Sequence, residues 1–240
     1  MKKILVIDDE KPTLGMFELF LGAYGYDVLT ADNAEEGLRI FEKERPPIVL
    51  TDIKMPGMDG LEVLKRIKRL DPTTEVIVIT GHGDMDLAVK AMALRATDFI
   101  NKPIKKSALD DALSRAERRR ELNFNQLEPK VQLRKVDNTA VISVKGDCTE
   151  ACRAKLLDTY KRAIEQTAKK ILLCFDPNCT FDGAIVEFLT KLFSEEKSED
   201  RTFAIAGITE NMKKVFGMVG LTKFADIYES EKTAFEAMCS

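Results

Sequence analysis

Hydrophobic residues in the first half of the chain follow two alternating patterns. Short runs rich in Val and Ile are apolar on both faces, which is typical of strands buried inside a parallel sheet. The longer segments between them repeat apolar residues every three or four positions, as amphipathic helices do. We therefore predict five strands, at residues 3–8, 27–30, 48–52, 75–80 and 97–102.

This alternation of strand and helix predicts the fold class of the first half. Five βα units form a doubly wound, five-stranded parallel sheet with helices on both faces, an α/β domain. The sequence also marks the start of one helix, because Asp59 stands at the expected N-cap and Glu62 follows three residues later. Leu61, Leu64 and Ile67 then form the apolar stripe of this helix.

The pattern changes after residue 124, and a second, small α/β domain is predicted. The segment "NQLEP" at 125–129 interrupts the helical periodicity. Residues 130–136 and 140–146 alternate apolar and polar side chains, as the half-buried strands of a hairpin do. Further strands are predicted at 170–175 and 203–207, and helices at 182–193 and 210–220. We expect domains at 1–124 and 129–240, joined by a linker at 125–128.

Composition excludes membrane-spanning and secreted classes of protein. The chain has 240 residues, of which 45% are hydrophobic and 32% charged, an ordinary balance for a globular protein. No apolar segment approaches the roughly 20 residues that a spanning helix needs. The opening "MKKILVIDDE" becomes acidic instead of continuing into a secretory signal. We therefore expect a cytoplasmic protein with no membrane insertion.

The distribution of charge argues against nucleic acid as a partner. Lys and Arg number 37 against 40 Asp and Glu, a formal net charge of −3. Neither half has the basic excess that binding to a phosphate backbone requires. The basic run Arg118-Arg119-Arg120 lies between Glu117 and Glu121, so we interpret it as a mixed, solvated helix face.

The cysteines and the single histidine form no recognisable metal or catalytic motif. His82 has no Ser or Cys partner nearby, which disfavours a hydrolytic triad. The cysteines lack a C-x-x-C pair and a neighbouring histidine, so they do not fit a zinc site. We interpret them as small buried residues in a reducing compartment. They are Cys148, Cys152, Cys174, Cys179 and Cys239.

Polar residues stand at the ends of four predicted strands. Because parallel strands end at one edge of their sheet, these side chains are expected to meet there. Clustered carboxylates repel one another unless a cation joins them, and an all-oxygen set of ligands suits Mg²⁺. The sequence therefore predicts a Mg²⁺ site. The strand-end residues are Asp8 and Asp9, Asp52, Thr80 and Lys102.

Four motifs in this half resemble the receiver domain of two-component response regulators, over roughly residues 1–122. They are "VIDDE", "TDIKMPGMDG", "VITGHGD" and "DFINKPI", in the order in which the family has them. The resemblance implies a flavodoxin-like fold in which a sensor histidine kinase phosphorylates Asp52. It also implies that Asp9, Asp52 and the backbone carbonyl of Lys54 bind Mg²⁺, with Asp8 as an outer-shell acid.

The same resemblance assigns roles around the phosphoryl group. Thr80 and Lys102 would contact its oxygens, and Phe99 would be the aromatic switch residue. The bond between Lys102 and Pro103 would be cis. Catalysis by the protein would then be limited to its own phosphotransfer and dephosphorylation at Asp52.

The second half resembles the STAS domain, a module of sulphate transporters and anti-sigma-factor antagonists. The likeness rests on "KILLCFDPNCTFDGAIVEFL" and "VFGMVGLTKFADIYESEKTAF". In antagonists that are regulated by phosphorylation, a Ser or Thr follows an Asp at the start of the second helix. Here Gly183 and Ala184 follow Asp182, so the usual hydroxyl acceptor is absent. Asp182 and Gly183 are the candidate partner surface.

Together the two resemblances imply a response regulator whose STAS-like output domain binds a protein, by partner switching. The partner would be of the anti-sigma-factor or kinase type, and a homodimer is left open. The alternative is a sensor of a small ligand or nucleotide, in which the receiver gates binding to the second domain. The second half has no reactive cluster, so an enzymatic output is disfavoured.

Overall fold

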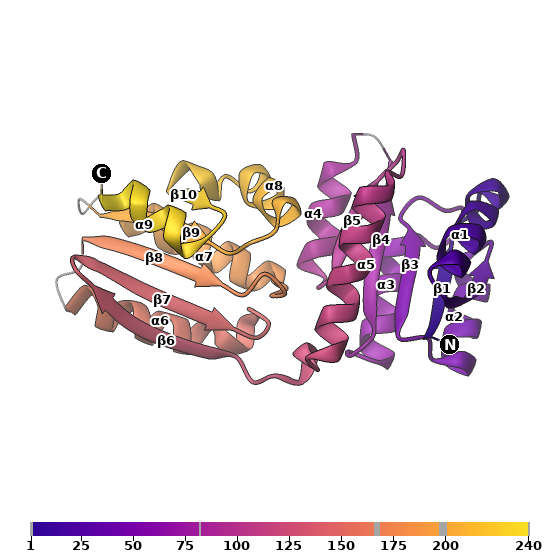
Figure 1. Cartoon of the computed structure of the whole chain (residues 1–240), viewed down its shortest axis with the longest axis horizontal. Helices are drawn as coiled ribbons and strands as arrows, with labels where there is room; N and C mark the ends of the chain where they lie inside the picture. The colour runs from indigo at the N-terminus through magenta and orange to yellow at the C-terminus, as the bar shows by residue number, and fades with distance from the viewer. Residues whose placement is uncertain (1, 82, 166–168, 197–200, 240) are drawn as a thin grey trace. The chain divides into compact units, whose positions relative to one another are not determined.

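The computed structural model describes residues 2–81, 83–165, 169–196 and 201–239. The chain forms two compact units, Met1–Gln126 and Leu127–Ser240, coloured from indigo to yellow along the chain in Figure 1. The division falls in the segment interpreted as a linker, and the exact domain bounds stay a prediction. His82 lies outside the described residues.

A parallel sheet with strand order β2-β1-β3-β4-β5 forms the centre of the first unit. This order confirms the predicted doubly wound α/β fold. Because the order reverses between β1 and β3, the loops after these strands diverge at the carboxyl edge, where such folds bind ligands. The strands are β1 (Lys2–Ile7), β2 (Tyr26–Ala31), β3 (Ile48–Asp52), β4 (Glu75–Thr80) and β5 (Asp98–Asn101).

Helices cover both faces of this sheet (Figure 1). On one face, α1 and α5 share a hydrophobic core with Ile4 and Val6. Ile7 points to the opposite face, where a Cβ at Gly37 of α2 would lie only 2.4 Å from its Cδ1 atom. Helices α3 and α4 follow α2 along the chain and pack beside one another. The helices are α1 (Lys11–Ala23), α2 (Ala34–Glu44), α3 (Gly60–Leu70), α4 (Met85–Ala93) and α5 (Lys106–Glu121).

Side-chain caps explain where two of these helices begin. Asp59 Oδ1 accepts a hydrogen bond of 2.9 Å from the Glu62 amide, which confirms the predicted N-cap of α3. Asn33 caps α2 in the same way, through the Glu36 amide at 2.9 Å. Each cap pairs a backbone N–H that has no partner within its helix.

A buried arginine anchors the end of the first unit. Arg119 on α5 is 1% exposed, and its Nε atom lies 2.9 Å and 3.0 Å from the carboxylate oxygens of Glu75, at the start of β4. Its guanidinium lies 5.1 Å from the ring centroid of Phe124, in the 3-10 helix η1 (Phe124–Gln126). The interpretation of the basic run as a solvated face is therefore wrong for Arg119, although Arg118 is exposed.

The second unit contains a mixed sheet of order β10-β9-β8-β7-β6. Strands β6 and β7 form the predicted antiparallel hairpin, which turns at Asp137 with φ 51°. The remaining neighbours, β7 with β8, β8 with β9 and β9 with β10, are parallel. The strands are β6 (Lys130–Val136), β7 (Thr139–Lys145), β8 (Lys170–Phe175), β9 (Thr202–Ala206) and β10 (Ala225–Tyr228).

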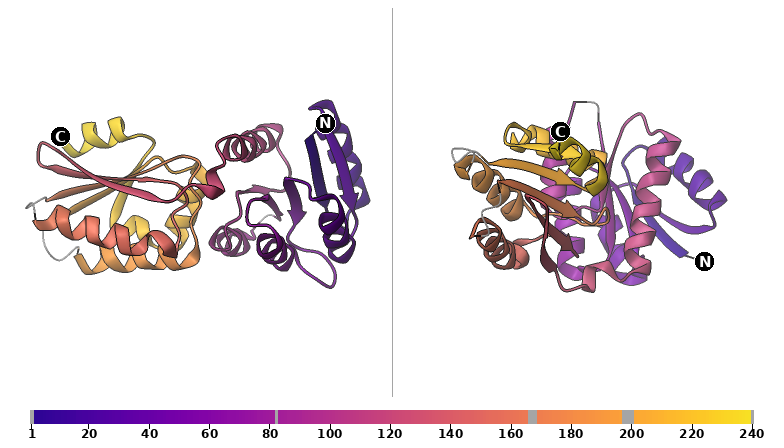
Figure 2. Two further views of the ribbon diagram at one scale, coloured as in Figure 1. Left: turned by 90° about the horizontal axis from the view of Figure 1, so that it is seen from below. Right: turned by 60° about the vertical axis from the view of Figure 1, so that its left-hand side comes forward.

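Helices also cover both faces of the second sheet. Figure 2 shows α6 and α7 together on one face and α9 on the other, where α9 shares a core with Val141 and Leu172. Phe181 packs edge-on against Phe175 and Phe216, with ring centroids 5.0 Å and 5.4 Å away. The helices are α6 (Glu150–Glu165), α7 (Gly183–Glu196), α8 (Glu210–Met218), η3 (Leu221–Lys223) and α9 (Glu231–Cys239).

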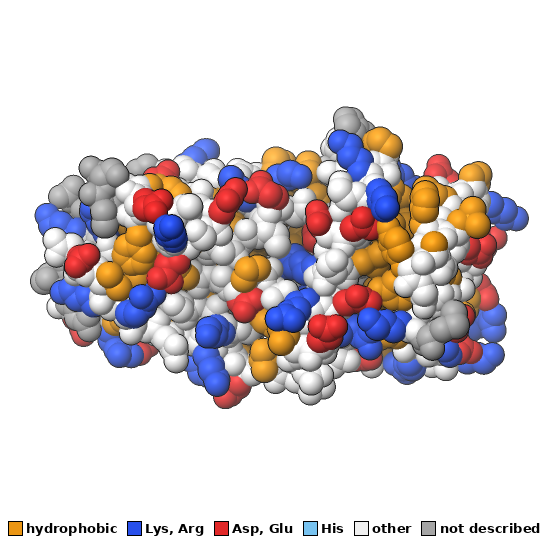
Figure 3. All heavy atoms as spheres, viewed as in Figure 1, with side chains coloured by type: hydrophobic (Ala, Val, Ile, Leu, Met, Phe, Trp, Pro, Cys, Tyr) orange, Lys and Arg blue, Asp and Glu red, His pale blue; other side chains and the backbone are white. Residues whose placement is uncertain are grey.

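The surface has mixed charge on the face shown in Figure 3, where Lys and Arg side chains are interspersed with Asp and Glu. Among the described residues, no helix has both the length and the apolar character that crossing a membrane would require.

Candidate functional site

Three aspartates meet at the carboxyl edge of the first sheet. Asp8 and Asp9 follow β1 directly, and Asp52 is the last residue of β3. One carboxylate oxygen of each lies within 4.8 Å of the others. Asp8 is fully buried and Asp52 is 5% exposed, whereas Asp9 is exposed. Asp52 is held by its own loop, because Oδ1 accepts a hydrogen bond of 3.0 Å from the Ile53 amide.

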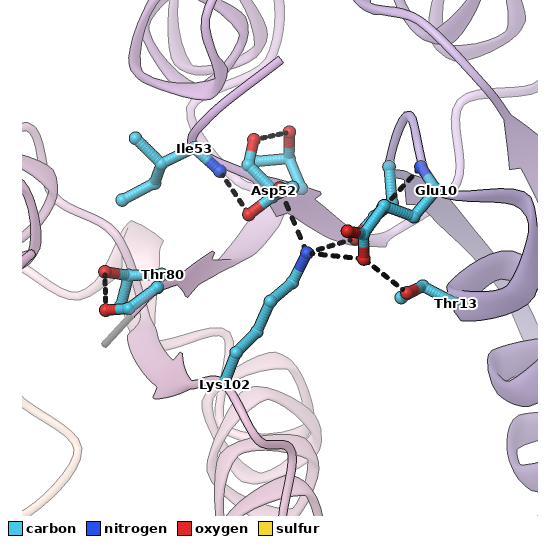
Figure 4. Close-up of polar contacts among 9 residues, drawn as sticks. Glu10, Thr13, Asp52, Ile53, Thr80 and Lys102 are labelled. Carbon is cyan, nitrogen blue, oxygen red and sulfur yellow. Dashed lines mark hydrogen bonds and ion pairs between the residues drawn. The ribbon is translucent and has the colours of Figure 1, made fainter.

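Lys102, just after β5, places its ammonium among the acidic groups, as Figure 4 shows. Its Nζ atom lies 3.1 Å from Asp52 Oδ2, 3.2 Å from Asp8 Oδ2 and 3.4 Å from Glu10 Oε2. The Lys102 amide donates to the Thr80 carbonyl at 2.7 Å, which ties this residue to the end of β4. The peptide bond from Lys102 to Pro103 is cis.

Burial and charge act in opposite directions on these groups. Burial raises the pKa of Asp52, and the nearby Lys102 only partly offsets this effect. The pKa of Asp8 is raised for the same reason. At Lys102, burial disfavours the charged form, but the Asp52 and Asp8 carboxylates outweigh it and raise the pKa. The lysine therefore stays protonated beside carboxylates whose negative charge it does not fully neutralise.

The donor set fits a divalent cation. Asp8, Asp52 and Glu10 contact the Lys102 ammonium, and Asp9 adds a fourth carboxylate beside Asp8 and Asp52. Within the described residues, Asp8 Oδ2 is buried and receives no hydrogen bond of good geometry, although it faces Lys102. A hard cation with all-oxygen ligands, such as Mg²⁺, would neutralise this excess of negative charge.

Known proteins match the two units separately. Residues 4–114 match the response regulator receiver domain, and residues 130–234 match the STAS domain. Sporulation initiation phosphotransferase F of Bacillus subtilis (strain 168) is 36% identical over 114 residues, which cover 48% of this chain and 92% of that protein. A crystal structure of a response regulator receiver domain protein from Clostridium thermocellum is 41% identical. The match covers 51% of this chain and 99% of the Clostridium thermocellum chain, with a TM-score of 0.50.

The chain belongs to the response regulator receiver family. Its second unit carries a STAS domain. The transcriptional regulatory protein GlrR of Escherichia coli (strain K12) is also similar, with 36% identity over 117 residues. That match covers 47% of this chain but 26% of GlrR, so the chain spans about a quarter of the length of such regulators.

Receiver domains bind Mg²⁺ through an acidic pocket, and in this chain Asp8, Asp9 and Asp52 lie close together at the corresponding edge of the sheet. Lys54, the remaining predicted ligand, lies in the loop after β3, in a shallow surface pocket that Asp9 also lines. Its side chain pairs with Asp84 Oδ1 at 2.8 Å. The metal-binding role of the Lys54 carbonyl stays a prediction.

Two predicted switch residues of the receiver domain lie outside the charged contacts. Thr80 ends β4 and is 1% exposed, and its Oγ1 lies 3.4 Å from the Gly81 carbonyl oxygen (Figure 4). Phe99 is 2% exposed in β5, opposite Val78 of β4. Both sit on the two strands beyond β3, so they border the site while Asp8, Asp9, Asp52 and Lys102 form its centre.

Two further residues of this receiver site, Glu10 and Gly60, were not predicted from the sequence. Glu10 reaches Lys102, and its amide donates to Asp8 Oδ1 at 2.9 Å; its position directly after two aspartates was the available signal. Gly60 begins α3 where a Cβ would lie 2.0 Å from the Asp52 carbonyl oxygen. Any larger residue would push α3 away from Asp52 and open the loop between them.

In the STAS domain, Asp182 caps two helices at once. Its Oδ1 accepts from the Ile185 amide at 2.9 Å, at the start of α7. Its Oδ2 accepts from the Glu150 amide at 2.8 Å, at the start of α6. Gly183 is the first residue of α7, and the nearby Thr180 is 1% exposed, which makes it a poor acceptor site.

Proposed function

We propose that this protein is a response regulator that a sensor histidine kinase phosphorylates on Asp52, and that phosphorylation controls binding of a protein to its STAS domain. The observation that carries this proposal is the position of Asp52. It stands at the end of a buried strand, 3.1 Å from the Lys102 ammonium and within 4.8 Å of two further aspartates.

The proposed chemistry is transfer of a phosphoryl group to a carboxylate. An Asp52 oxygen attacks phosphorus, the bond from phosphorus to the donor breaks, and the electron pair leaves with the donor. Such a transfer needs alignment and neutralisation of charge more than proton chemistry. Lys102 supplies one positive charge, and Asp52 is aligned by β3 and by the Ile53 amide.

Asp9, Asp52 and the backbone carbonyl of Lys54 would hold Mg²⁺, with Asp8 outside the first ligand sphere. The ion, when bound, neutralises charge on the phosphoryl oxygens. Asp8 also orients Lys102, because its Oδ2 lies 3.2 Å from Nζ.

The signal would leave the site through β4 and β5. Thr80 would turn toward the phosphoryl oxygens, and Phe99 would move into the space that Thr80 vacates. Both residues precede α5, which leads through η1 to the STAS domain. There the edge around Asp182 and Gly183 would contact the partner, a protein of the anti-sigma-factor or kinase type. A cytoplasmic location is part of this proposal.

The first experiment tests the acceptor. The full chain is incubated with acetyl phosphate and Mg²⁺, and phosphorylation is measured by mass spectrometry. Asp52→Asn should abolish the modification. Asp59→Asn is the matched control, because it keeps a capping side chain in the same loop and should be modified normally. Modification elsewhere, or without Mg²⁺, would contradict the assignment.

The second experiment tests the output. Proteins retained by the full chain are compared with and without beryllofluoride, for wild type and Asp52→Asn. A protein retained in one state of the wild type only supports partner switching. If no protein discriminates the states, whereas a small molecule or nucleotide shifts the thermal unfolding of the chain, the sensor alternative is favoured.

A further inference from the structure

Two buried thiols touch beneath the start of α6 in the STAS domain. Cys148 and Cys152 are both fully buried, and their Sγ atoms lie 3.2 Å apart. A third thiol, Cys179, is 2% exposed on the neighbouring loop and donates to the Thr180 carbonyl at 3.3 Å. Three thiols therefore lie in one small buried region of the STAS domain.

The thiol pair lies where two loops, residues 147–150 and 180–182, are hydrogen-bonded to one another. Thr180 N donates to Asp147 Oδ1 at 3.0 Å, and Cys148 N donates to the Thr180 carbonyl at 2.9 Å. Glu150 N donates to Asp182 Oδ2 at 2.8 Å. The backbone of Cys148 is therefore hydrogen-bonded to the loop that carries Asp182.

The two sulfurs have different acidities. The hydrogen bond between the two thiols lowers the pKa of Cys152, even though burial opposes this. The same interaction raises the pKa of Cys148. Cys152 also lies in the first turn of α6, where backbone N–H groups and the helix dipole favour a negative charge. The position of Cys152 in the first turn of α6 therefore favours it as the nucleophile of the pair.

We propose that Cys148 and Cys152 are a redox modification site, which a hydroperoxide converts reversibly to a disulfide that alters the Asp182 edge. The sulfurs need to approach by only about 1.2 Å to reach bonding distance. Transient disulfides of this kind are the type that reducing compartments allow. The effect on partner binding rests on the function proposed above, whereas formation of the disulfide does not.

The reaction balances with a hydroperoxide as the oxidant. The Cys152 thiolate attacks one peroxide oxygen, the O–O bond breaks, and a sulfenic acid and hydroxide form. Cys148 then attacks the sulfenic sulfur, the S–O bond breaks, and the proton from the Cys148 thiol leaves with the hydroxyl group as water. The two thiols lose two electrons, and hydrogen peroxide becomes two waters. Because both thiols are buried, a small oxidant that enters during local opening is favoured over a bulky disulfide.

Trypsin makes the test specific, because it cuts after Lys145 and Arg153. Both cysteines then lie in one peptide, residues 146–153, which contains no methionine that peroxide could oxidise. Cys174 and Cys179 share the peptide 171–191. The full chain is reduced, treated with hydrogen peroxide, alkylated and digested. We expect peptide 146–153 to lose two hydrogen atoms, to resist alkylation, and to recover both thiols after dithiothreitol.

Variants separate this pair from the other thiols. Burial raises the pKa of Cys174 to about 12, so Cys174→Ala should leave oxidation of peptide 146–153 unchanged. Cys152→Ala should leave Cys148 open to alkylation after peroxide, and thermal unfolding checks that this variant is folded. A bond that joins peptide 146–153 to peptide 171–191, or two fully alkylated thiols after peroxide treatment, overturns the proposal.

The effect on the Asp182 edge has its own readout, which needs no partner. Hydrogen exchange of residues 147–152 and 180–185 is measured in the reduced and oxidised full chain. We expect exchange to change in both segments of the wild type and in neither segment of Cys152→Ala. If the disulfide forms and exchange at 180–185 stays the same, the link to the partner edge is wrong. Neither result depends on phosphorylation, so Asp52→Asn tests the proposed function independently.

Discussion

Lys102 is the residue on which the charge balance of the receiver site depends. Its ammonium contacts Asp52 at the end of β3, and Asp8 and Glu10 in the loop after β1. It is only partly exposed, so water screens these interactions less than on the open surface. The same charge that stabilises the acidic cluster would stabilise the phosphoryl group on Asp52.

Lys102→Ala should slow phosphorylation of Asp52 by acetyl phosphate by on the order of 10²-fold, the usual cost of one charge-stabilising donor. Lys105→Ala, an exposed lysine three residues further on, is the matched control and should keep the wild-type rate. The rate is followed by mass spectrometry at a fixed Mg²⁺ concentration. Equal rates for the two variants would show that Lys102 does not act on the transferred group.

Asp52→Asn should stabilise the protein at neutral pH in metal-free buffer. Burial raises the pKa of Asp52 in the folded state. An acid with a raised folded pKa costs stability above that pKa, and the cost disappears as the pH falls through it. The variant should therefore unfold at a higher temperature than the wild type. The difference should shrink when thermal unfolding is measured at progressively lower pH.

Asp59→Asn should show no such gain, because Asp59 is an exposed cap. Mg²⁺ should raise the unfolding temperature of the wild type more than that of Asp52→Asn, because one charged ligand is missing in the variant. A lower unfolding temperature for Asp52→Asn in metal-free buffer would mean that its ion pair with Lys102 outweighs the cost of burial.

Strand β4 runs from the amino edge to the carboxyl edge of the receiver sheet. Thr80 ends this strand beside the acidic cluster, and Glu75 begins it beside Arg119 of α5. Thr97, the residue before β5, donates a hydrogen bond to Glu75, so the start of β5 contacts the same buried network. Strand β4 therefore connects Thr80 at its carboxyl end to Glu75 at its start, and Glu75 is hydrogen-bonded to Arg119 of α5.

Arg119→Met should destabilise the protein by about 3–5 kcal/mol, because Glu75 would remain as a buried charge without its cationic partner. Arg118→Met, on the same helix but with a side chain that is 61% exposed, should change stability by no more than about 0.5 kcal/mol. Urea denaturation at neutral pH measures both. Similar stabilities for the two variants would contradict a structural role for the buried pair.

The sequence was most informative where a pattern repeats. Strands such as 48–52 and the cap at Asp59 could be predicted because period and capping are local properties. Arg119 could not, since the charge of a residue in a helix does not reveal that a carboxylate lies opposite it on another strand. The contact of Cys148 with Cys152 was also hidden, because spacing alone does not say that both side chains turn inward.

At the scale of the whole molecule, the chain passes from one unit to the other through a short segment. Helix η1 ends at Gln126 and β6 begins at Lys130, so three residues separate the last element of the receiver unit from the first element of the STAS unit. The linker that could absorb a movement of α5 and η1 is therefore short. This short connection supports the proposed control of the STAS domain by Asp52.

We expect beryllofluoride with Mg²⁺ to change the affinity of the full chain for its partner by about ten-fold, which corresponds to about 1.4 kcal/mol of coupling. Thr80→Ala should still accept phosphate at Asp52 but lose this change, because the group that senses the phosphoryl oxygens is gone. Thr30→Ala, near the end of β2 at the opposite edge of the sheet, is the control and should keep it. Isothermal titration calorimetry measures the partner affinity of each full-length protein and of the fragment 127–240. If the fragment and both states of the full chain bind equally, the receiver does not control the STAS domain, and if Thr80→Ala still responds, the signal leaves Asp52 by another route.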